Sequence, residues 1–282
     1  MNLESTIKKA SQKLKNNNIT SHALDAQIIL ADIIGVKRES LITNNQINIS
    51  EIIIKKYDKA IKRRINHEPI AYITEKKEFW SQDFFTNRST LVPRPETELL
   101  IYKIADIFKN KRINILDIGT GTGCILLSLL KELYNSRGIG IDISPGAIKI
   151  AKANSKNLNL VNRAKFKNFE IDSYTLGKYD LIVSNPPYIP SKDIKKLSKD
   201  IINFEPKEAL DGGSDGLDLI KKVIYKSNIL LKRNGMLALE IGFGQYSRVC
   251  EILKRYKFRE YSKIYDYNSN VRCILTTKID FY

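Results

Sequence analysis

One apolar stretch ends in residue types that could hold a flat polar group. Residues 179–183 read Tyr-Asp-Leu-Ile-Val, and Ser-Asn-Pro-Pro-Tyr follows. Pro186 and Pro187 fix two φ angles and remove two backbone donors, while Asn185, which precedes a proline, is driven to an extended backbone. The Asn185 side-chain oxygen and the Pro186 carbonyl could each accept an N–H of a planar amide or amino group, on which Tyr188 could stack. Taken alone, the same segment could also be a rigid end to a strand.

A second set of residues has the pattern of a nucleoside-binding loop. An apolar run ends in a loop that consists of Gly119, Thr120, Gly121, Thr122 and Gly123. Glycines at the carboxyl edge of a parallel sheet let the backbone approach a ligand closely. The G-x-G-x-G spacing differs from the G-x-G-x-x-G of dinucleotide folds, which disfavours pyrophosphate binding. Asp142 ends the next strand about 20 residues later, where an acid can accept both hydroxyls of a ribose.

Weaker candidates lie at other predicted strand and helix ends. Asp172 and Ser173 follow the third predicted strand, where they could contact an adenine ring, although an aspartate there is most often a cap. Residues 94–96, Arg-Pro-Glu, fit a helix start and could also border the site. Glu205 could likewise border the site, and the alternative is that it is an acid on a solvated loop.

Composition limits the class of protein without defining it. The net charge of +16, from 47 Lys and Arg against 31 Asp and Glu, suggests a partner that bears nucleic acid. The surplus is +6 over residues 1–95 and +10 over the rest, so no basic tail stands out, and genome bias remains an alternative. Three dispersed cysteines and two histidines predict no metal site and no disulfide framework. The chain shows no apolar run of membrane-spanning length and no secretory signal, so we expect a cytoplasmic protein.

The elements that must position these residues change character along the chain. Residues 1–70 show apolar side chains at helical spacing, with Gly35 as a helix stop and Ser50 as an N-cap. Residues 71–95 are rich in aromatic and β-branched residues without helical period, which predicts a β-hairpin linker. Residues 96–282 then alternate between helix and strand, as in a parallel, doubly wound α/β sheet.

Seven strands are predicted in this last part, with helices between the first six. The strands are expected at residues 113–119, 137–144, 164–172, 179–185, 235–242, 259–267 and 271–277. Because only a short Asn-Ser-Asn segment joins the last two, they should form an antiparallel hairpin at one edge of the sheet.

Taken in order, the glycine loop, Asp142 and the Asn-Pro-Pro-Tyr segment resemble a class I S-adenosylmethionine-dependent methyltransferase with a Rossmann-like fold. The stretches HEPIAYIT, EFW, LVPRPETELL, FEPKEAL and DGGSDGLDLI further resemble the PrmC/HemK family. Members of that family methylate the glutamine of the GGQ motif in class-1 peptide chain release factors. The chain departs from the family at Glu75, where a glycine usually follows the Tyr-Ile-Thr stretch.

The resemblance implies a role for each candidate residue. S-adenosylmethionine would lie against residues 119–123 and contact Asp142, Asp172, Ser173 and Asn185, and no metal would be needed. The catalytic segment would be Asn185, Pro186, Pro187 and Tyr188. Residues 1–70 would recognise the protein substrate, a class-1 release factor, and we expect a monomer.

Three other functions are weighed beside this one. Amino-methylation of adenine or guanine in nucleic acid shares the Asn-Pro-Pro-Tyr signature and would use the positive charge, so direct nucleic-acid binding stays open. A dehydrogenase on the same fold is disfavoured by the loop spacing and by the Asn-Pro-Pro-Tyr segment. A non-catalytic binding scaffold is disfavoured because the cofactor and substrate motifs are both complete.

Overall fold

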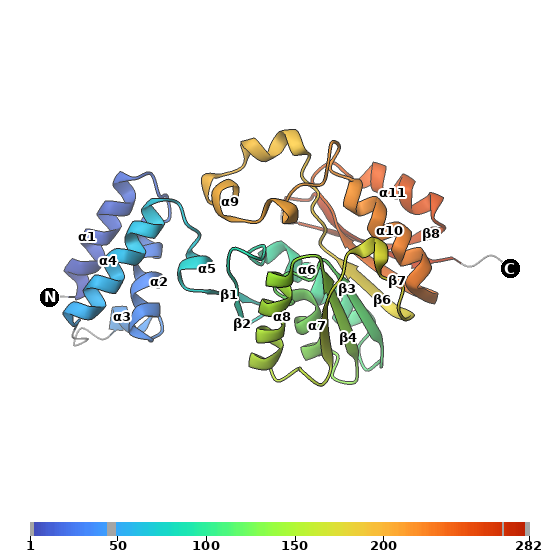
Figure 1. Cartoon of the computed structure of the whole chain (residues 1–282), viewed down its shortest axis with the longest axis horizontal. Helices are drawn as coiled ribbons and strands as arrows, with labels where there is room; N and C mark the ends of the chain where they lie inside the picture. Colours follow the sequence, from blue (N-terminus) through green and yellow to red (C-terminus); the bar gives the residue numbers. More distant parts are fainter. Residues whose placement is uncertain (1–2, 44–48, 267, 280–282) are drawn as a thin grey trace. The chain divides into compact units, whose positions relative to one another are not determined.

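The computed structural model describes residues 3–43, 49–266 and 268–279 (Figure 1). By their internal contacts, the residues fall into two units, Met1–Lys76 with Ser198–Phe204, and Lys77–Leu197 with Glu205–Tyr282. We call them the N-terminal unit and the sheet unit.

The N-terminal unit is helical, as the apolar spacing of residues 1–70 predicts. Its helices are α1 (Leu3–Asn16), α2 (His22–Ile34), α3 (Ser40–Thr43), α4 (Glu51–Ile65), α5 (Ile70–Ile73) and α9 (Lys199–Phe204). The predicted helix stop and N-cap are both present: Gly35 ends α2 in the left-handed conformation, and the Ser50 hydroxyl accepts from the backbone N–H of Ile53.

The apolar stripes of α1, α2 and α4 form a core of their own, to which Leu14, Ile29 and Ile61 contribute. The buried Tyr57 hydroxyl donates to the Ala26 carbonyl at 2.8 Å, which satisfies the one polar group that this ring carries. The unit therefore has the buried apolar surface that an independently packed domain needs.

A two-stranded hairpin, β1 (Lys76–Phe79) and β2 (Gln82–Phe85), follows the helices. Trp80 and Ser81 form its two-residue turn with positive φ angles of 51° and 54°, a conformation that suits the right-handed twist of a hairpin. The two strands lie inside residues 71–95, where a hairpin was expected, and the short α5 overlaps the start of that segment. Pro69 precedes α5 and supplies the fixed φ angle that starts a helical turn.

The sheet unit is built on seven strands. They are β3 (Asn114–Ile118), β4 (Arg137–Asp142), β5 (Ala164–Asn168), β6 (Tyr179–Ser184), β7 (Leu231–Glu240), β8 (Phe258–Tyr265) and β9 (Val271–Lys278). Each lies at a predicted position; Tyr267, the end of the predicted sixth strand, lies outside the described residues.

The strand order is β5-β4-β3-β6-β7-β9-β8. The first five pair in parallel, whereas β9 is antiparallel to both of its neighbours and β8 lies at the edge. The predicted mostly parallel sheet with an antiparallel edge hairpin is confirmed. Since the chain leaves β3 toward β4 on one side and returns to β6 on the other, the order reverses beside β3, and ligands bind at such a switch point.

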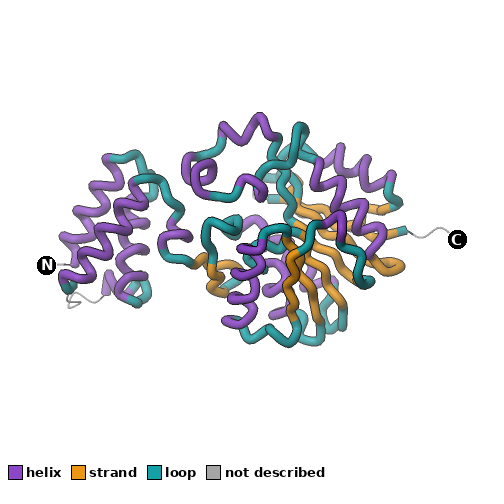
Figure 2. Tube along the Cα trace, viewed as in Figure 1, coloured by secondary structure: helices purple, strands orange, loops and turns teal. Residues whose placement is uncertain are grey.

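Helices cover both faces of the sheet (Figures 1 and 2). Successive residues of β3 point to opposite cores, Ile115 to one and Leu116 to the other. The first core takes side chains from α6 (Glu98–Ile107), α7 (Cys124–Glu132) and α8 (Pro145–Asn157), the second from α10 (Asp218–Leu230) and α11 (Tyr246–Arg255). The short 3-10 helices of this unit are η1 (Pro95–Thr97), η2 (Ile171–Ser173), η3 (Ser191–Lys196) and η4 (Lys207–Ala209).

The prediction of a helix between each pair of the first six strands was wrong at one place. Between β5 and β6 the chain forms only η2, and no α-helix. Residues 169–178 number too few for a covering helix once the turns at both ends are made, and Gly177 has a positive φ. This shorter connection still carries Asp172 and Ser173 past the carboxyl end of β5.

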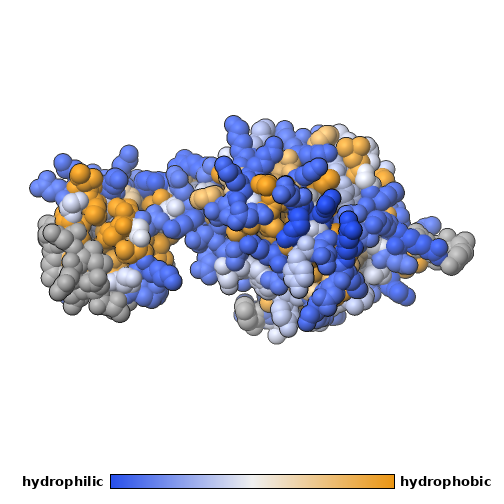
Figure 3. Space-filling view, turned by 90° about the horizontal axis from the view of Figure 1, so that it is seen from below, coloured by the Kyte–Doolittle hydropathy of each residue, from blue (hydrophilic) through white to orange (hydrophobic). Residues whose placement is uncertain are grey.

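On the face shown in Figure 3, the sheet unit presents mainly hydrophilic side chains. Hydrophobic residues gather on the visible face of the N-terminal unit. Among the large apolar side chains of this unit, wherever they lie on its surface, Leu24 and Ile52 are 45% and 68% exposed. No helix within the described residues has the length and apolar character to span a membrane.

Candidate active site

The sheet register aligns the predicted site residues along one edge. Ile118 of β3 pairs with Ile141 of β4 and with Ser184 of β6, and Ser184 pairs with Leu239 of β7. The residues that follow these four paired positions are Gly119, Asp142, Asn185 and Glu240, so all four lie at the same edge of the sheet. Two segments far apart in the sequence thus meet at the carboxyl edge: residues 119–123, here called the glycine loop, and residues 185–188, here called the NPPY segment.

The glycine loop has a backbone that only glycine adopts without strain. Gly119, Gly121 and Gly123 have φ angles of 71°, 55° and 79°. A Cβ added to Gly119 or Gly121 would meet no atom within 4 Å, so open space lies beside the loop. The backbone amides of Gly119 and Thr120 both donate to the Ile141 carbonyl, which ties the loop to the end of β4.

Asp142 lies beside this loop and helps to hold it. One carboxylate oxygen accepts from the backbone N–H of Gly121 at 2.9 Å, and the other accepts from that of Ser144 at 2.9 Å. Burial raises the pKa of Asp142, and these N–H donors oppose the shift. Each oxygen retains a lone pair, so the carboxylate can still accept the two hydroxyls of a ribose.

A buried acid that the sequence analysis did not select lies under the loop. Asp117 is fully buried, and Thr120 donates to its Oδ2 at 2.6 Å. Its Oδ1 makes no hydrogen bond of good geometry with the described residues, although the nearby Leu126 backbone N–H favours the ionised form. Burial raises the pKa of Asp117 to about 7. The open space beside Gly119 and Gly121 and the free lone pairs of Asp142 fit S-adenosylmethionine, and Asp117 supports the loop from below through Thr120.

Asp172 and Ser173 lie on η2, after β5. The Asp172 carboxylate pairs with Lys222 at 2.5 Å and is about half exposed, and the Ser173 hydroxyl donates to the Glu170 carbonyl. Lys226 donates to the Asp172 backbone carbonyl at 2.6 Å, which fixes this turn against α10. Contact of these two residues with adenine stays a prediction.

The NPPY segment begins with the Asn185 carboxamide, whose NH2 group is hydrogen-bonded to a buried hydroxyl. Asn185 Nδ2 donates to the Thr97 hydroxyl at 3.4 Å, and that hydroxyl donates to Glu240 Oε2 at 2.7 Å. Thr97 and Glu240 are both buried. The Asn185 Oδ1 and the Pro186 carbonyl accept no hydrogen bond from the described residues, so two acceptors remain for a substrate.

Tyr188 joins the same network at its other end. Its hydroxyl accepts from Arg272 at 2.9 Å and lies 3.5 Å from Glu240 Oε1, and the Arg272 guanidinium lies over its ring at 5.4 Å. Burial raises the pKa of Tyr188, and the Glu240 charge adds to that effect, so the phenol stays neutral. The Arg272 guanidinium thus covers one face of the Tyr188 ring.

Residues 211–216 pack directly against the NPPY segment. A Cβ on Gly216 would lie 2.4 Å from the Tyr188 carbonyl oxygen, and one on Gly212 would lie 2.8 Å from that of Pro187. Gln245 Nε2 donates to the same Tyr188 carbonyl at 2.9 Å. The DGGSDG stretch thus gives the two prolines a close-fitting support.

The secondary candidates form a structural pair. Arg94 donates to Glu205 at 2.6 Å, and the backbone N–H of Val92 lies 3.3 Å from the same carboxylate. The Glu205 side chain is buried, so the alternative of a solvated loop acid was wrong. The bond ties the LVPR stretch to the FEP stretch. The remaining members of the predicted 94–96 group lie on η1, next to Thr97.

Sequence reasoning missed Asp117, Thr97, Glu240 and Arg272. The two acids carried a usable signal, since each interrupts an apolar strand that runs to the ligand-binding edge. Thr97 and Arg272 carried none, because their roles depend on side-chain contacts between segments more than 80 residues apart in sequence.

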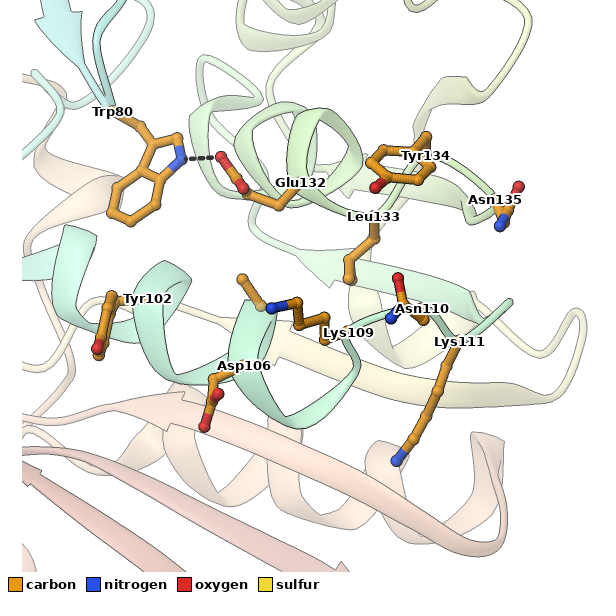
Figure 4. A pocket seen from close by; sticks show the side chains of 11 residues that line it. Trp80, Tyr102, Asp106, Lys109, Asn110, Lys111, Glu132, Leu133, Tyr134 and Asn135 are labelled. Carbon is orange, nitrogen blue, oxygen red and sulfur yellow. Dashed lines mark hydrogen bonds between the residues drawn. The ribbon is translucent and has the colours of Figure 1, made fainter.

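A cavity of about 410 Å³ lies away from this site (Figure 4). Trp80, Tyr102 and Glu132 are among its lining residues, and Trp80 Nε1 donates to Glu132 at 2.7 Å. The loops that line it, at 109–111 and 133–135, precede β3 and β4, so it lies at the amino edge of the sheet. It does not contribute to the site described above.

Comparison with known proteins identifies a domain family in the N-terminal part of the chain and another in its sheet unit. Residues 5–74 match the family model of the PrmC N-terminal domain, and residues 109–240 match that of a methyltransferase domain. Among solved structures, a methyltransferase from Pyrococcus furiosus is similar, with a TM-score of 0.53 and 17% identity over 70% of this chain and 88% of that one. At this identity the similarity concerns the fold alone.

Two curated relatives extend over nearly the whole chain. It is 36% identical to the bifunctional methyltransferase of Rickettsia typhi, but spans only 58% of that protein. It is also 36% identical, over 99% of both chains, to the release factor glutamine methyltransferase of Clostridium acetobutylicum. This agreement over both lengths confirms the predicted family: the chain belongs to the release factor glutamine methyltransferases.

Proposed function

We propose that the chain transfers a methyl group from S-adenosylmethionine to the side-chain amide nitrogen of the GGQ glutamine in class-1 peptide chain release factors. The observation that carries this is a pair of acceptors, Asn185 Oδ1 and the Pro186 carbonyl, that receive no hydrogen bond from the described residues. Neither proline of the segment has an N–H that could compete as a donor. A glutamine amide offers two N–H groups, one for each acceptor. The similarity to the Clostridium relative over both full lengths supports the same substrate.

The chemistry requires positioning more than activation. An amide nitrogen is a poor nucleophile because its lone pair is delocalised into the carbonyl. When bound, S-adenosylmethionine supplies an electrophilic methyl group. The glycine loop, Asp142 and Asp117 would hold this cofactor, while Asn185 and Pro186 would fix both amide hydrogens so that the nitrogen faces the methyl carbon. The Tyr188 ring would cover the amide and exclude water.

The test is methyl transfer to competing acceptors in parallel. The protein is incubated with tritium-labelled S-adenosylmethionine and, separately, with a purified class-1 release factor, with total RNA and with DNA. We expect label in the factor, located by mass spectrometry on the GGQ glutamine. Label in nucleic acid, with none in the factor, would instead favour amino-methylation of adenine or guanine, the alternative that the +16 charge supports.

We further propose that the N-terminal unit recognises the release factor. It has its own hydrophobic core, it matches the PrmC N-terminal domain, and it exposes large apolar side chains such as Ile52. Removal of residues 1–70 should leave cofactor binding largely intact and lower methylation of the intact factor. Equal methylation by the truncated and full-length proteins would contradict this role. Action as a monomer in the cytoplasm is part of the proposal, and the three free cysteines suit a reducing compartment.

A further inference from the structure

The Asn185 carboxamide is oriented by a chain of hydrogen bonds from a buried acid. The chain runs from Asn185 Nδ2 to the Thr97 hydroxyl and on to Glu240 Oε2, over distances of 3.4 and 2.7 Å. Its three residues come from the end of β6, from η1 and from the last position of β7. Thr97 and Glu240 are only 2% and 1% exposed, so water does not compete for these groups.

The direction of each bond follows from the number of protons. An ionised carboxylate only accepts, so the single Thr97 proton points to Glu240. The Thr97 oxygen then presents lone pairs to Asn185, and only the NH2 side of the carboxamide can face it. Oδ1 is therefore turned to the opposite side, where it makes no hydrogen bond with the described residues.

The charge on Glu240 has a nearby counter-ion. Arg272 lies 3.7 Å from Oε1, the Tyr188 hydroxyl lies 3.5 Å from the same atom, and the Glu96 charge opposes ionisation. Burial raises the pKa of Glu240, while Thr97, Arg272 and Tyr188 oppose that shift. The carboxylate is thus paired and hydrogen-bonded on both oxygens, as a buried charge must be.

We propose that Thr97 and Glu240 are positioning residues that set the orientation of the Asn185 carboxamide, with its acceptor oxygen turned to the substrate. The inference rests on the proposed function, because it assumes that the substrate offers an N–H to Asn185. Without this relay the carboxamide can rotate by half a turn and present a donor to that N–H. Such a rotation would replace an attraction by a repulsion at the reacting nitrogen.

The first test needs no substrate. The side-chain amide signal of Asn185 is assigned in the nitrogen-15 spectrum by its loss in Asn185→Ala, and exchange of its protons with water is measured. Thr97→Val removes the hydroxyl at nearly constant shape, and it should speed exchange of the protected proton about fivefold, the effect of losing one hydrogen bond. Glu240→Gln should act in the same direction, because its amide can donate to Thr97 and release the hydroxyl proton toward Asn185.

Matched variants separate orientation from packing. Thr97→Ser keeps the hydroxyl and should retain the wild-type Asn185 exchange rate. Thr86→Val removes a different buried hydroxyl of the same unit, one that bonds to Thr90, and should not move the Asn185 signal. Equal exchange rates in wild type, Thr97→Val and Glu240→Gln would overturn the proposal. If Glu240→Gln does not fold, the Thr97 pair alone decides.

The second test asks whether Thr97 acts through Asn185. In single-turnover methyl transfer to the release factor, Thr97→Val should lower the rate about tenfold or more, with cofactor affinity unchanged. In the Asn185→Ala background the same change should have less than about a twofold effect, because the group that it orients is gone. An equal loss in both backgrounds would overturn the relay. A wild-type protein that does not label the factor would count against the proposed function, whereas the exchange measurement would still decide the orientation.

Discussion

The two halves of the site are built in different ways. The proposed cofactor half, formed by the glycine loop with Asp117 and Asp142, uses backbone conformation: positive φ angles, open space where a Cβ would lie, and N–H groups held by one carboxylate. The acceptor half, formed by the NPPY segment with its supports, uses side chains. Thr97, Glu240 and Arg272 hold Asn185 and Tyr188 by hydrogen bonds.

This difference determines how each half can be altered. A backbone cradle depends on residues that can adopt a given φ angle, so its changes affect affinity and stability together. A side-chain network places one acceptor atom, so its changes affect the transition state more than the ground state. Variants that alter one half at a time test that contrast.

The largest effect is expected at Asn185. Asn185→Ala removes an acceptor that acts when the amide nitrogen is turned to the methyl group, so turnover should fall about 100-fold or more. Cofactor affinity should stay close to wild type, since the cofactor half is untouched. Single-turnover methyl transfer to the release factor, alongside equilibrium cofactor binding, measures both quantities.

Asn185→Asp sharpens the same test. It keeps the shape and an acceptor but places a negative charge near the sulfonium of the bound cofactor. Cofactor affinity should equal or exceed that of wild type, while glutamine turnover should drop. Near-normal turnover in both variants would mean that the NPPY segment is only a rigid end to β6.

The second effect concerns the pH dependence of stability in the cofactor half. The pKa of Asp117 is raised to about 7, from an ordinary value of 3.8. Its contribution to the free energy of unfolding is therefore fully present below pH 3.8 and is lost as the pH rises to about 7. Asp117→Asn cannot ionise, so over this window wild type should lose stability relative to the variant, by at most about 1.4 kcal/mol per pH unit. Urea unfolding of both proteins at several pH values measures the difference, and a constant difference would contradict the titration of Asp117.

A matched glycine pair separates backbone strain from ligand contact. Gly121 and Gly35 both have positive φ, and a Cβ on either meets no atom within 4 Å. Alanine at either position should lower the free energy of unfolding by about 1 kcal/mol. Only Gly121→Ala should weaken cofactor binding, because its methyl group would enter the space beside the loop. Unchanged affinity by calorimetry would remove the glycine loop from the cofactor site.

The smallest effect is expected at Glu75, where the family resemblance led us to expect a glycine. Glu75 is exposed and has a φ of 57°, a conformation that favours glycine. Glu75→Gly should relieve the strain but increase the freedom of the unfolded chain, for a net gain below about 1 kcal/mol. Lys77→Gly, in the neighbouring strand where φ is not positive, should instead destabilise the protein. Thermal unfolding of both variants checks the sign, and destabilisation by Glu75→Gly would contradict the strain.

The local parts of the fold and of the site can be predicted from the sequence. The seven strands, the main helices of the N-terminal unit, the glycine loop with Asp142, and the NPPY segment could all be read from contiguous patterns. Apolar periodicity and the φ preferences of glycine and proline act within a few residues. The prediction of an α-helix between β5 and β6 was wrong for a reason that is also local, because too few residues connect those strands.

The surroundings of the Asn185 acceptor depend instead on packing between distant segments. Thr97 precedes Asn185 by 88 residues, and Arg272 follows Tyr188 by 84, yet each pair is within hydrogen-bond distance. The strand order, with β9 between β7 and β8, brings Arg272 beside Glu240. Neither propensity nor spacing encodes such contacts, since they arise when the sheet aligns the ends of strands that are distant in the sequence. The glycine loop and Asp142 are therefore visible in the sequence, whereas the orientation of the Asn185 amide depends on the packed sheet.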